Sequence, residues 1–511
     1  MSATTVTART VRTAPLVPVA VALTLLGAAV ATGSSTHTVT SLAVLLLLAT
    51  FAAARPVAAV SWPHLLAALI AVILFIPMRR YALPGSLPFQ LEPYRIFVAL
   101  LVLGWIASLL VDRRLRFRRT GFESPLVVIV GSVVASIAVN PTRVASVSSD
   151  VAKSLTFFVS FVLVLYLIAS TIRRLIDIEF LTKMLVVGGS VVAFFAIIEA
   201  RTGFNVFNHL SRFVPFLHGG QIAGPAYLRL GTAKVRVFAS AEHPIALSAA
   251  LVILAPLALY LARRYQQRRW WLCALLFLAA VASTVSRTGI VMFVVVALVF
   301  LWLRPRETRR FWPAIFPALI AIHFVLPGTL GAVKQSFFPA GGLIAQQKAS
   351  ANTSGSGRLA DLGPALTEWQ AEPVLGQGYG TQVVNDNARG IQANIFDDQW
   401  LGTLLATGAV GFFGWLWFFV RVVRRCAAEA KRDDSERGWL LTAIAAGVAA
   451  LGVGMVTFDA FAFIQVTFLL FILVGLASAL LAERPTPLAV RLERGDRGPS
   501  ADDLAPHSAP A

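Results

Sequence analysis

Residues 460–482 read AFAFIQVTFLLFILVGLASALLA, an apolar run without a charged side chain. A helix needs about 20 such residues to cross the hydrocarbon core of a bilayer. In lipid, the backbone N–H and C=O groups must find partners within the segment, so a run of this kind spans the bilayer as a helix and not as a strand. The stretch therefore predicts a transmembrane helix.

The same pattern recurs along the chain, which has 511 residues, of which 57% are apolar and only 14% charged, with a mean hydropathy of +0.75. Soluble domains carry roughly 25% charged residues, so this composition excludes a soluble multi-domain protein. We expect an all-α polytopic membrane protein with about 14 transmembrane helices (12–14). The predicted spans are 16–33, 39–54, 61–78, 95–111, 124–140, 153–171, 184–200, 244–262, 270–286, 288–304, 312–330, 399–420, 439–457 and 460–482.

The net charge of +19 fixes the expected topology. Lys and Arg concentrate in cytoplasmic loops, and here their clusters follow even-numbered spans or lie at a terminus, which indicates a multi-pass protein of the cytoplasmic (inner) membrane with both termini in the cytoplasm. Because the excess of Lys and Arg is explained by the cytoplasmic loops, it does not indicate nucleic-acid binding. The resulting division is a cytoplasmic N-terminus (1–15), N-terminal helices (16–200), an external loop (201–243), helices (244–330), a large, partly helical external loop (331–398), C-terminal helices (399–482) and a disordered cytoplasmic tail (483–511).

Two cysteines exclude a disulfide framework, and no His/Cys/Asp/Glu group has the spacing of a metal site. We therefore expect neither a metal nor a cofactor. Ionisable groups are also missing from the centres of the spans, where a transporter usually places them. This distribution favours an enzyme that acts at the outer leaflet over a transporter that works by alternating access.

A few arginines are predicted to lie on the external side of the membrane, where the charge rule does not expect them. Arg287 belongs to a Ser-Arg-Thr-Gly junction between the spans 270–286 and 288–304, expected to be external or sunk in the outer leaflet. An ionisable group at that depth is a candidate functional residue, although an arginine whose side chain reaches the interface is the structural alternative.

Lys234 and Arg236 lie where the first external loop returns to the membrane, just before Glu242, His243 and Pro244. Guanidinium groups bind phosphate through a planar fork, so these cations suggest an anionic ligand. Lipid anchoring is equally compatible with Lys234 and Arg236, and capping or packing is the preferred role of His243. Arg79 and Arg80 are expected to anchor the chain at the interface.

The larger loop supplies acids, and Asp397 and Asp398 directly precede the span 399–420. They are candidates for a general base or for the N-cap of that helix. The glycine-rich segment 376–380 is expected to form a turn rather than a phosphate cradle.

Three pieces of sequence are similar to the O-antigen ligase and polymerase superfamily of membrane glycosyltransferases. The first begins at Arg236 and resembles an Arg-x-x-Gly-x-Phe-x-x-Pro entry to a span, without its glycine. The second is the junction around Arg287. The third runs from Arg358 through 373–380 to Asp397 and Asp398. Nine residues separate Asp398 from Gly-x-x-Gly (408–411), and Asp397 stands in place of the ligase histidine.

The resemblance implies a GT-C-type helical fold and an inverting, metal-independent transfer from a polyprenyl-diphosphate-linked glycan to a glycan, glycolipid or envelope acceptor. Arg236, Arg287 and Lys234 would bind the diphosphate, and Arg287 would also act in catalysis together with Asp397 or Asp398 as base. Arg358, Glu242 and His243 would serve the acceptor or support the loop. The alternatives are a transporter or flippase for a lipid-linked or anionic solute, and a membrane scaffold.

Overall fold

The computed structural model describes residues 61–83, 92–112, 115–214, 217–219, 236–311, 313, 315–338, 362–382 and 398–482. The expected spans 16–33 and 39–54, the N-terminal segment 1–15 and the tail 483–511 lie outside this part of the chain.

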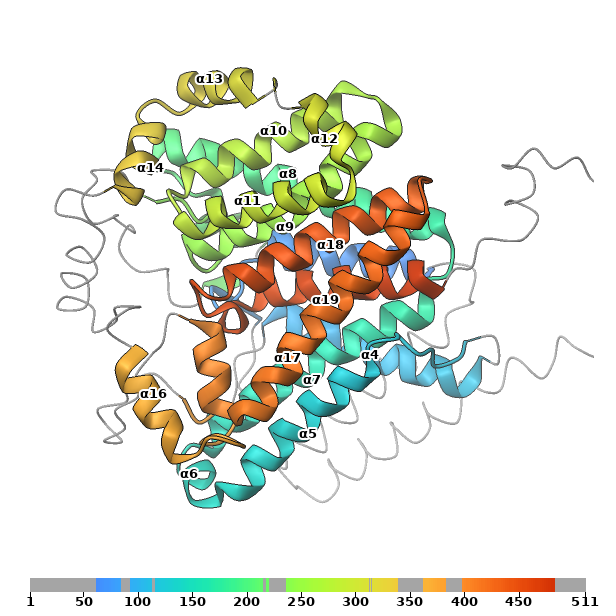
Figure 1. Ribbon diagram of the computed structural model, residues 1–511, viewed down its shortest axis with the longest axis vertical. Coiled ribbons are helices and arrows are strands. Elements are labelled where there is room, and N and C mark those ends of the chain that lie inside the picture. Colours follow the sequence, from blue (N-terminus) through green and yellow to red (C-terminus); the bar gives the residue numbers. More distant parts are fainter. Residues whose placement is uncertain are drawn as a thin grey trace, which may run out of the picture.

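Long apolar helices form a bundle (Figure 1). Seven of the described helices are long and apolar enough to cross a membrane, which confirms an all-α, multi-pass architecture; the total of 14 spans stays a prediction. The bundle helices are α3 (Trp62–Phe75), α4 (Pro93–Val111), α5 (Glu123–Val139), α7 (Ser148–Thr171), α8 (Leu175–Thr202), α9 (Pro244–Tyr265), α10 (Arg268–Ser283), α11 (Arg287–Leu303), α17 (Gln399–Arg432), α18 (Glu436–Gly454) and α19 (Ile464–Ala482).

Helix α19, which has no charged side chain, lies at the centre of the bundle, between α18 and α7 (Figure 1). In its apolar segment 94% of the residues are buried, against 28% in α4. Small residues allow the central helices to approach closely: a Cβ on Gly447 of α18 would lie 2.8 Å from the carbonyl oxygen of Ile253 in α9. This packing by small residues is the usual means of association of helices in lipid.

The arginine-rich junctions meet at one end of the bundle. Arg264, near the end of α9, pairs with Glu179 near the start of α8 at 3.0 Å. Arg304, directly after α11, pairs with Asp434 and donates to the carbonyl oxygen of Ala430 at 2.7 Å. This gathering agrees with the charge pattern from which the topology was predicted.

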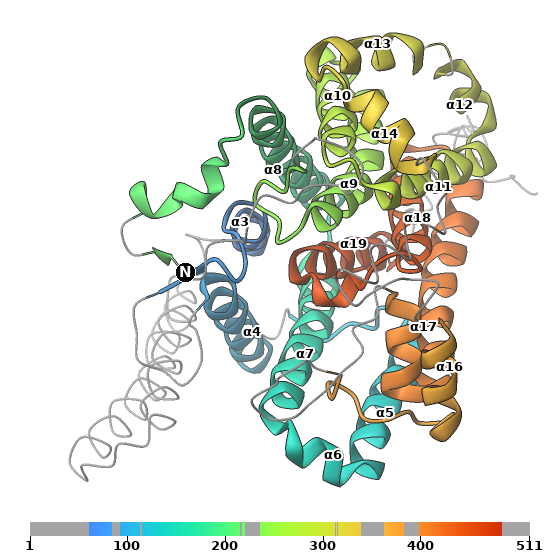
Figure 2. The same cartoon turned by 90° about the vertical axis from the view of Figure 1, so that its left-hand side faces the viewer.

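The expected span 312–330 is not one continuous helix. α13 (Ile315–Val325) has 11 residues, or roughly 16 Å at 1.5 Å per residue, and a turn at Pro327 and Gly328 separates it from α14 (Thr329–Phe337). Proline disfavours helix at the preceding residue, and Gly328 has a left-handed φ of 74°. These two helices pack on the outside of α10 (Figure 2).

Short elements complete the described chain. α14 and α16 (Leu362–Ala371) are the described helical parts of the larger loop, which agrees with the expectation that the loop 331–398 is partly helical. The other short elements are α6 (Pro141–Ser146), α12 (Pro305–Phe311), the 3₁₀ helices η1 (Val206–Arg212) and η3 (Ala460–Ala462), and the antiparallel pair β1 (Tyr81–Ala82) and β2 (His218–Gly219).

Helix α17 is broken at Gly408, which has φ 64° and ψ −167°. The backbone of the segment after α16 inserts at this break, where Ala409 N–H donates to the carbonyl oxygen of Pro373 at 2.9 Å. A Cβ on Gly376 would lie 2.5 Å from the backbone nitrogen of Gly408. The glycine-rich segment is thus a turn, as expected from the sequence, and it docks on a break in α17 that the sequence did not predict.

Candidate functional site

A tight turn leads into α9 and is fixed from several sides. Ala239 has a left-handed φ of 43° at the position where the resembling pattern has glycine. Its N–H donates to Glu199 Oε2 at 2.8 Å, and its carbonyl oxygen accepts from Asn205 and Arg80, each at 3.0 Å. These contacts hold the turn in a conformation that alanine rarely adopts.

Arg236 starts this turn and reaches across to the junction between α10 and α11. Its Nε donates to the carbonyl oxygen of Thr284 at 3.1 Å. Thr284 ends α10 and precedes Arg287, the first residue of α11, by three positions. The structure therefore brings the segments that carry Arg236 and Arg287 together.

The Ser-Arg-Thr-Gly junction is a sharp hairpin, and the structure explains two of its residues, Ser286 and Gly289. Ser286 caps α11, since its hydroxyl accepts from Gly289 N–H at 3.4 Å. A Cβ on Gly289 would lie 2.9 Å from the Cβ of Ser248 in α9. The preceding Val285 has φ 49°, a strained value for a β-branched residue, of the kind that collects at functional sites.

The segment between α18 and α19 connects this hairpin to the start of α17. The hydroxyls of Thr288 and Thr457 lie 2.8 Å apart. Gln399 N–H donates to Met455 O at 3.0 Å, and Gln399 Oε1 accepts from Phe461 N–H at 2.6 Å. Through these bonds Asp398, the neighbour of Gln399, lies at the same end of the bundle as Arg287.

Asp398 caps α17: its Oδ1 accepts from the N–H groups of Trp400 at 2.9 Å and Leu401 at 3.2 Å. The capping role considered from the sequence is thus present, and the role as a base stays a prediction. Asp397, Lys234 and Arg358 lie outside the described residues.

Glu242 lies beside the turn with a side chain only 10% exposed, and its Oε2 is 3.4 Å from Nη1 of Arg79. Its Oε1 is buried and makes no hydrogen bond to the described part of the chain. Burial raises the pKa of Glu242 to about 7, although the Arg79 guanidinium acts in the opposite direction. A carboxyl group of this pKa exchanges protons near neutral pH, as a general base requires.

His243 has the capping and packing role preferred from the sequence. Its Nδ1 accepts from Ile245 N–H at 3.2 Å, and its ring lies over that of Phe463, with centroids 5.8 Å apart. Among the described residues, no group of three or more His, Cys, Asp or Glu side chains is placed to hold a metal ion.

Sequence reasoning missed several supporting residues. Arg80 does not anchor the chain at the interface: it is only 6% exposed and bonds to carbonyl oxygens of the turn. The sequence gives no signal for Glu199, because a charged residue at the end of an apolar span such as 184–200 is ordinary. Asp459 was also missed, although it lies between two expected spans on the external side. Burial and the Asp459 carboxylate raise the pKa of Tyr379, which places Tyr379 near this acid.

The described helices define an all-α, multi-pass membrane protein. Residues 272–416 match the family model described as O-antigen ligase. This segment covers less than half of the chain, runs from α10 to the middle of α17 and includes Arg287 and Asp398, and the match confirms the resemblance drawn from the sequence. No curated protein matches the chain.

Proposed function

We propose that this protein transfers or polymerises glycan from a polyprenyl-diphosphate-linked donor onto an acceptor hydroxyl at the outer leaflet. The observation that carries the proposal is the hydrogen bond from Arg236 Nε to the Thr284 carbonyl oxygen, which brings two arginine-bearing segments together. Guanidinium groups on two neighbouring segments suit the two phosphates of a diphosphate.

The chemistry is a single displacement. The acceptor oxygen attacks the anomeric carbon, the bond from that carbon to the diphosphate oxygen breaks, and the configuration inverts. Arg236 and Arg287 stabilise the negative charge that grows on the departing polyprenyl diphosphate. Asp397 or Asp398 takes the hydroxyl proton, and the lipid tail stays between helices in the bilayer.

The remaining candidates are assigned by position. Lys234, two residues before Arg236, adds positive charge for the diphosphate. Arg358, Glu242 and His243 belong to the acceptor side or support the loop. The envelope acceptor is a glycan or a glycolipid, and the protein works in the inner membrane with both termini in the cytoplasm.

The deciding experiment is Arg287→Ala in the full-length protein, assayed for transfer from a polyprenyl-diphosphate-linked glycan. We expect transfer to fall by about 10²–10³-fold, with insertion and thermal stability retained. Arg212→Ala, an exposed arginine of η1, is the matched control and should keep full activity. Normal transfer in Arg287→Ala would overturn the role of Arg287 in binding diphosphate.

The orientation is tested separately in a background without Cys273 and Cys426. Ser211→Cys, at the site end, should react with a membrane-impermeant maleimide in intact cells, and Gln267→Cys, in an arginine-rich junction, only after permeabilisation. The opposite pattern would reverse the proposed topology.

A further inference from the structure

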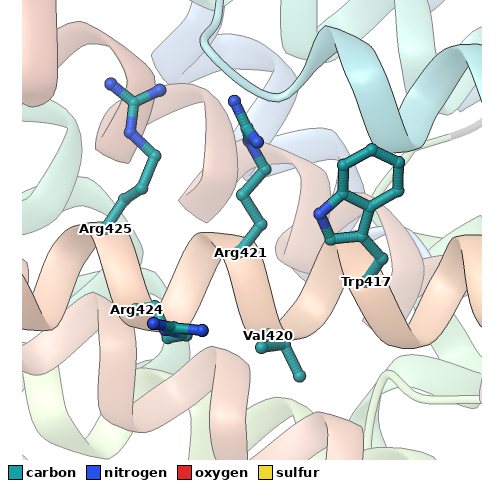
Figure 3. A pocket seen from close by; sticks show the side chains of 5 residues that line it. All are labelled: Trp417, Val420, Arg421, Arg424 and Arg425. Carbon is teal, nitrogen blue, oxygen red and sulfur yellow. The ribbon is translucent and has the colours of Figure 1, made fainter.

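A basic hollow lies on α17 at the end of the bundle opposite to the candidate site, with a volume of about 300 Å³. In Figure 3, Trp417, Arg421 and Arg425 extend from one face of the helix, and Val420 and Arg424 extend from the face beside it. The proposed transfer reaction uses none of these residues.

The three guanidinium groups of this hollow are not neutralised by the described residues, none of whose carboxylates pairs with Arg421, Arg424 or Arg425. Arg421 Nε and Arg425 Nη1 share one acceptor, the carbonyl oxygen of Gly121, at 3.0 and 2.9 Å. Some of the other arginines at this end do have carboxylate partners in the structure, namely Arg263, Arg264, Arg304 and Arg437.

The hollow continues into an apolar strip along the same helix. Phe413, Leu416, Trp417 and Val420 are all exposed, and their spacing places them on one side of α17. Helix α5 packs beside α17 and leaves further apolar side chains exposed, namely Val127, Val130 and Val134. From Phe413 to Arg424 the helix rises roughly 16 Å, close to half the thickness of a bilayer core.

We propose that this strip and hollow form a specific binding site for an anionic phospholipid. The phosphate of the headgroup binds the guanidinium groups of Arg421, Arg424 and Arg425, Trp417 lies at the boundary between headgroup and chain, and an acyl chain follows the apolar strip. Charge complementarity selects the occupant, because three adjacent cations attract a phosphate diester and gain nothing from a second copy of the same basic, apolar surface. Basic pockets between transmembrane helices bind lipid headgroups by the same means.

The test titrates the full-length protein in neutral detergent with phosphatidylglycerol and follows the first bound lipid by native mass spectrometry. Arg424→Gln is the informative variant, because Arg424 makes no hydrogen bond or ion pair with the described chain. At about 1 kcal/mol for each arginine near a headgroup, the apparent Kd should weaken about fivefold. Arg268→Gln removes an exposed arginine from the same end, at the start of α10, and should change the Kd by less than twofold.

Two further titrations identify the occupant. Phosphatidylcholine should bind at least tenfold more weakly than phosphatidylglycerol, and inorganic phosphate at millimolar concentration should not displace phosphatidylglycerol. Equal weakening by Arg424→Gln and Arg268→Gln would show general charge attraction and overturn the site. So would displacement by phosphate, or a dimer that forms through the strip and excludes lipid.

Discussion

Arg236 Nε donates a hydrogen bond to the carbonyl oxygen of Thr284, 3.1 Å away and 48 residues along the chain. The bond attaches the turn before α9 to the hairpin between α10 and α11, where Val285 has a strained backbone and Arg287 begins a helix. The structure thus brings together two arginine-bearing segments that lie far apart in the sequence.

Arg236 and Arg287 should act as a unit. We expect Arg236→Ala and Arg287→Ala each to lower transfer by about 10²–10³-fold, and the double variant to lose much less than the product of the two, because both groups contact one diphosphate. Initial rates of the four proteins of the cycle measure the coupling. Strictly multiplicative losses would contradict a shared ligand.

Asp398 has two separable roles, and substitutions can divide them. Asp398→Asn should keep the cap on α17, since Asn and Asp cap helices equally well, but should lower transfer by about 10²–10⁴-fold if Asp398 is the base. Asp398→Ala should additionally cost about 1 kcal/mol of stability. The same assay of Asp397→Asn completes the comparison, and full activity in both Asn variants would exclude both acids as the base.

Glu242 should make stability depend on pH. Its pKa is about 7 in the folded protein against 4.5 for the free side chain, so between these values the folded state holds a proton that the unfolded state has lost. The contribution of Glu242 to stability is therefore complete below pH 4.5 and is lost as pH rises through 7, a change of about 3 kcal/mol at 1.36 kcal/mol per pH unit.

The Glu242→Gln side chain has the shape of protonated glutamate and stays uncharged at every pH. The substitution should therefore flatten the dependence of stability on pH. Thermal unfolding in detergent between pH 5 and 8 measures it. Glu372→Gln, at an exposed position, should retain the slope of the unchanged protein. A slope that survives in Glu242→Gln would assign the dependence to another group.

Ala239 occupies a glycine conformation, with φ 43°. A left-handed backbone destabilises a residue with a Cβ by about 1–2 kcal/mol. Glycine removes this cost, but it also makes the unfolded chain more flexible, which lowers stability by about 0.4–1 kcal/mol. Ala239→Gly should therefore stabilise the protein by about 0.5–1 kcal/mol, seen as a higher Tm. Ala241→Gly, two residues later and without a positive φ, should lower Tm.

The break in α17 depends on Gly408. A Cβ there would lie 2.2 Å from the carbonyl oxygen of Val374, so Gly408→Ala should displace the turn around Gly376 and destabilise the protein by about 3 kcal/mol or more. Gly363→Ala, in α16 with open space around it, should be neutral or stabilising. Equal stability of the two variants would show that the break needs no glycine.

The sequence by itself determined the class of fold, because apolar length and charge asymmetry are properties of single segments. It also identified the junction around Arg287 and the capping acid Asp398, since short motifs and helix starts are local. Only the tertiary structure decided that α19 lies at the centre, that Arg236 meets Thr284, and that Arg80 is buried under the turn at Ala239. These are contacts between helices distant in sequence, and in an apolar chain each helix has the same composition whether it faces lipid or protein.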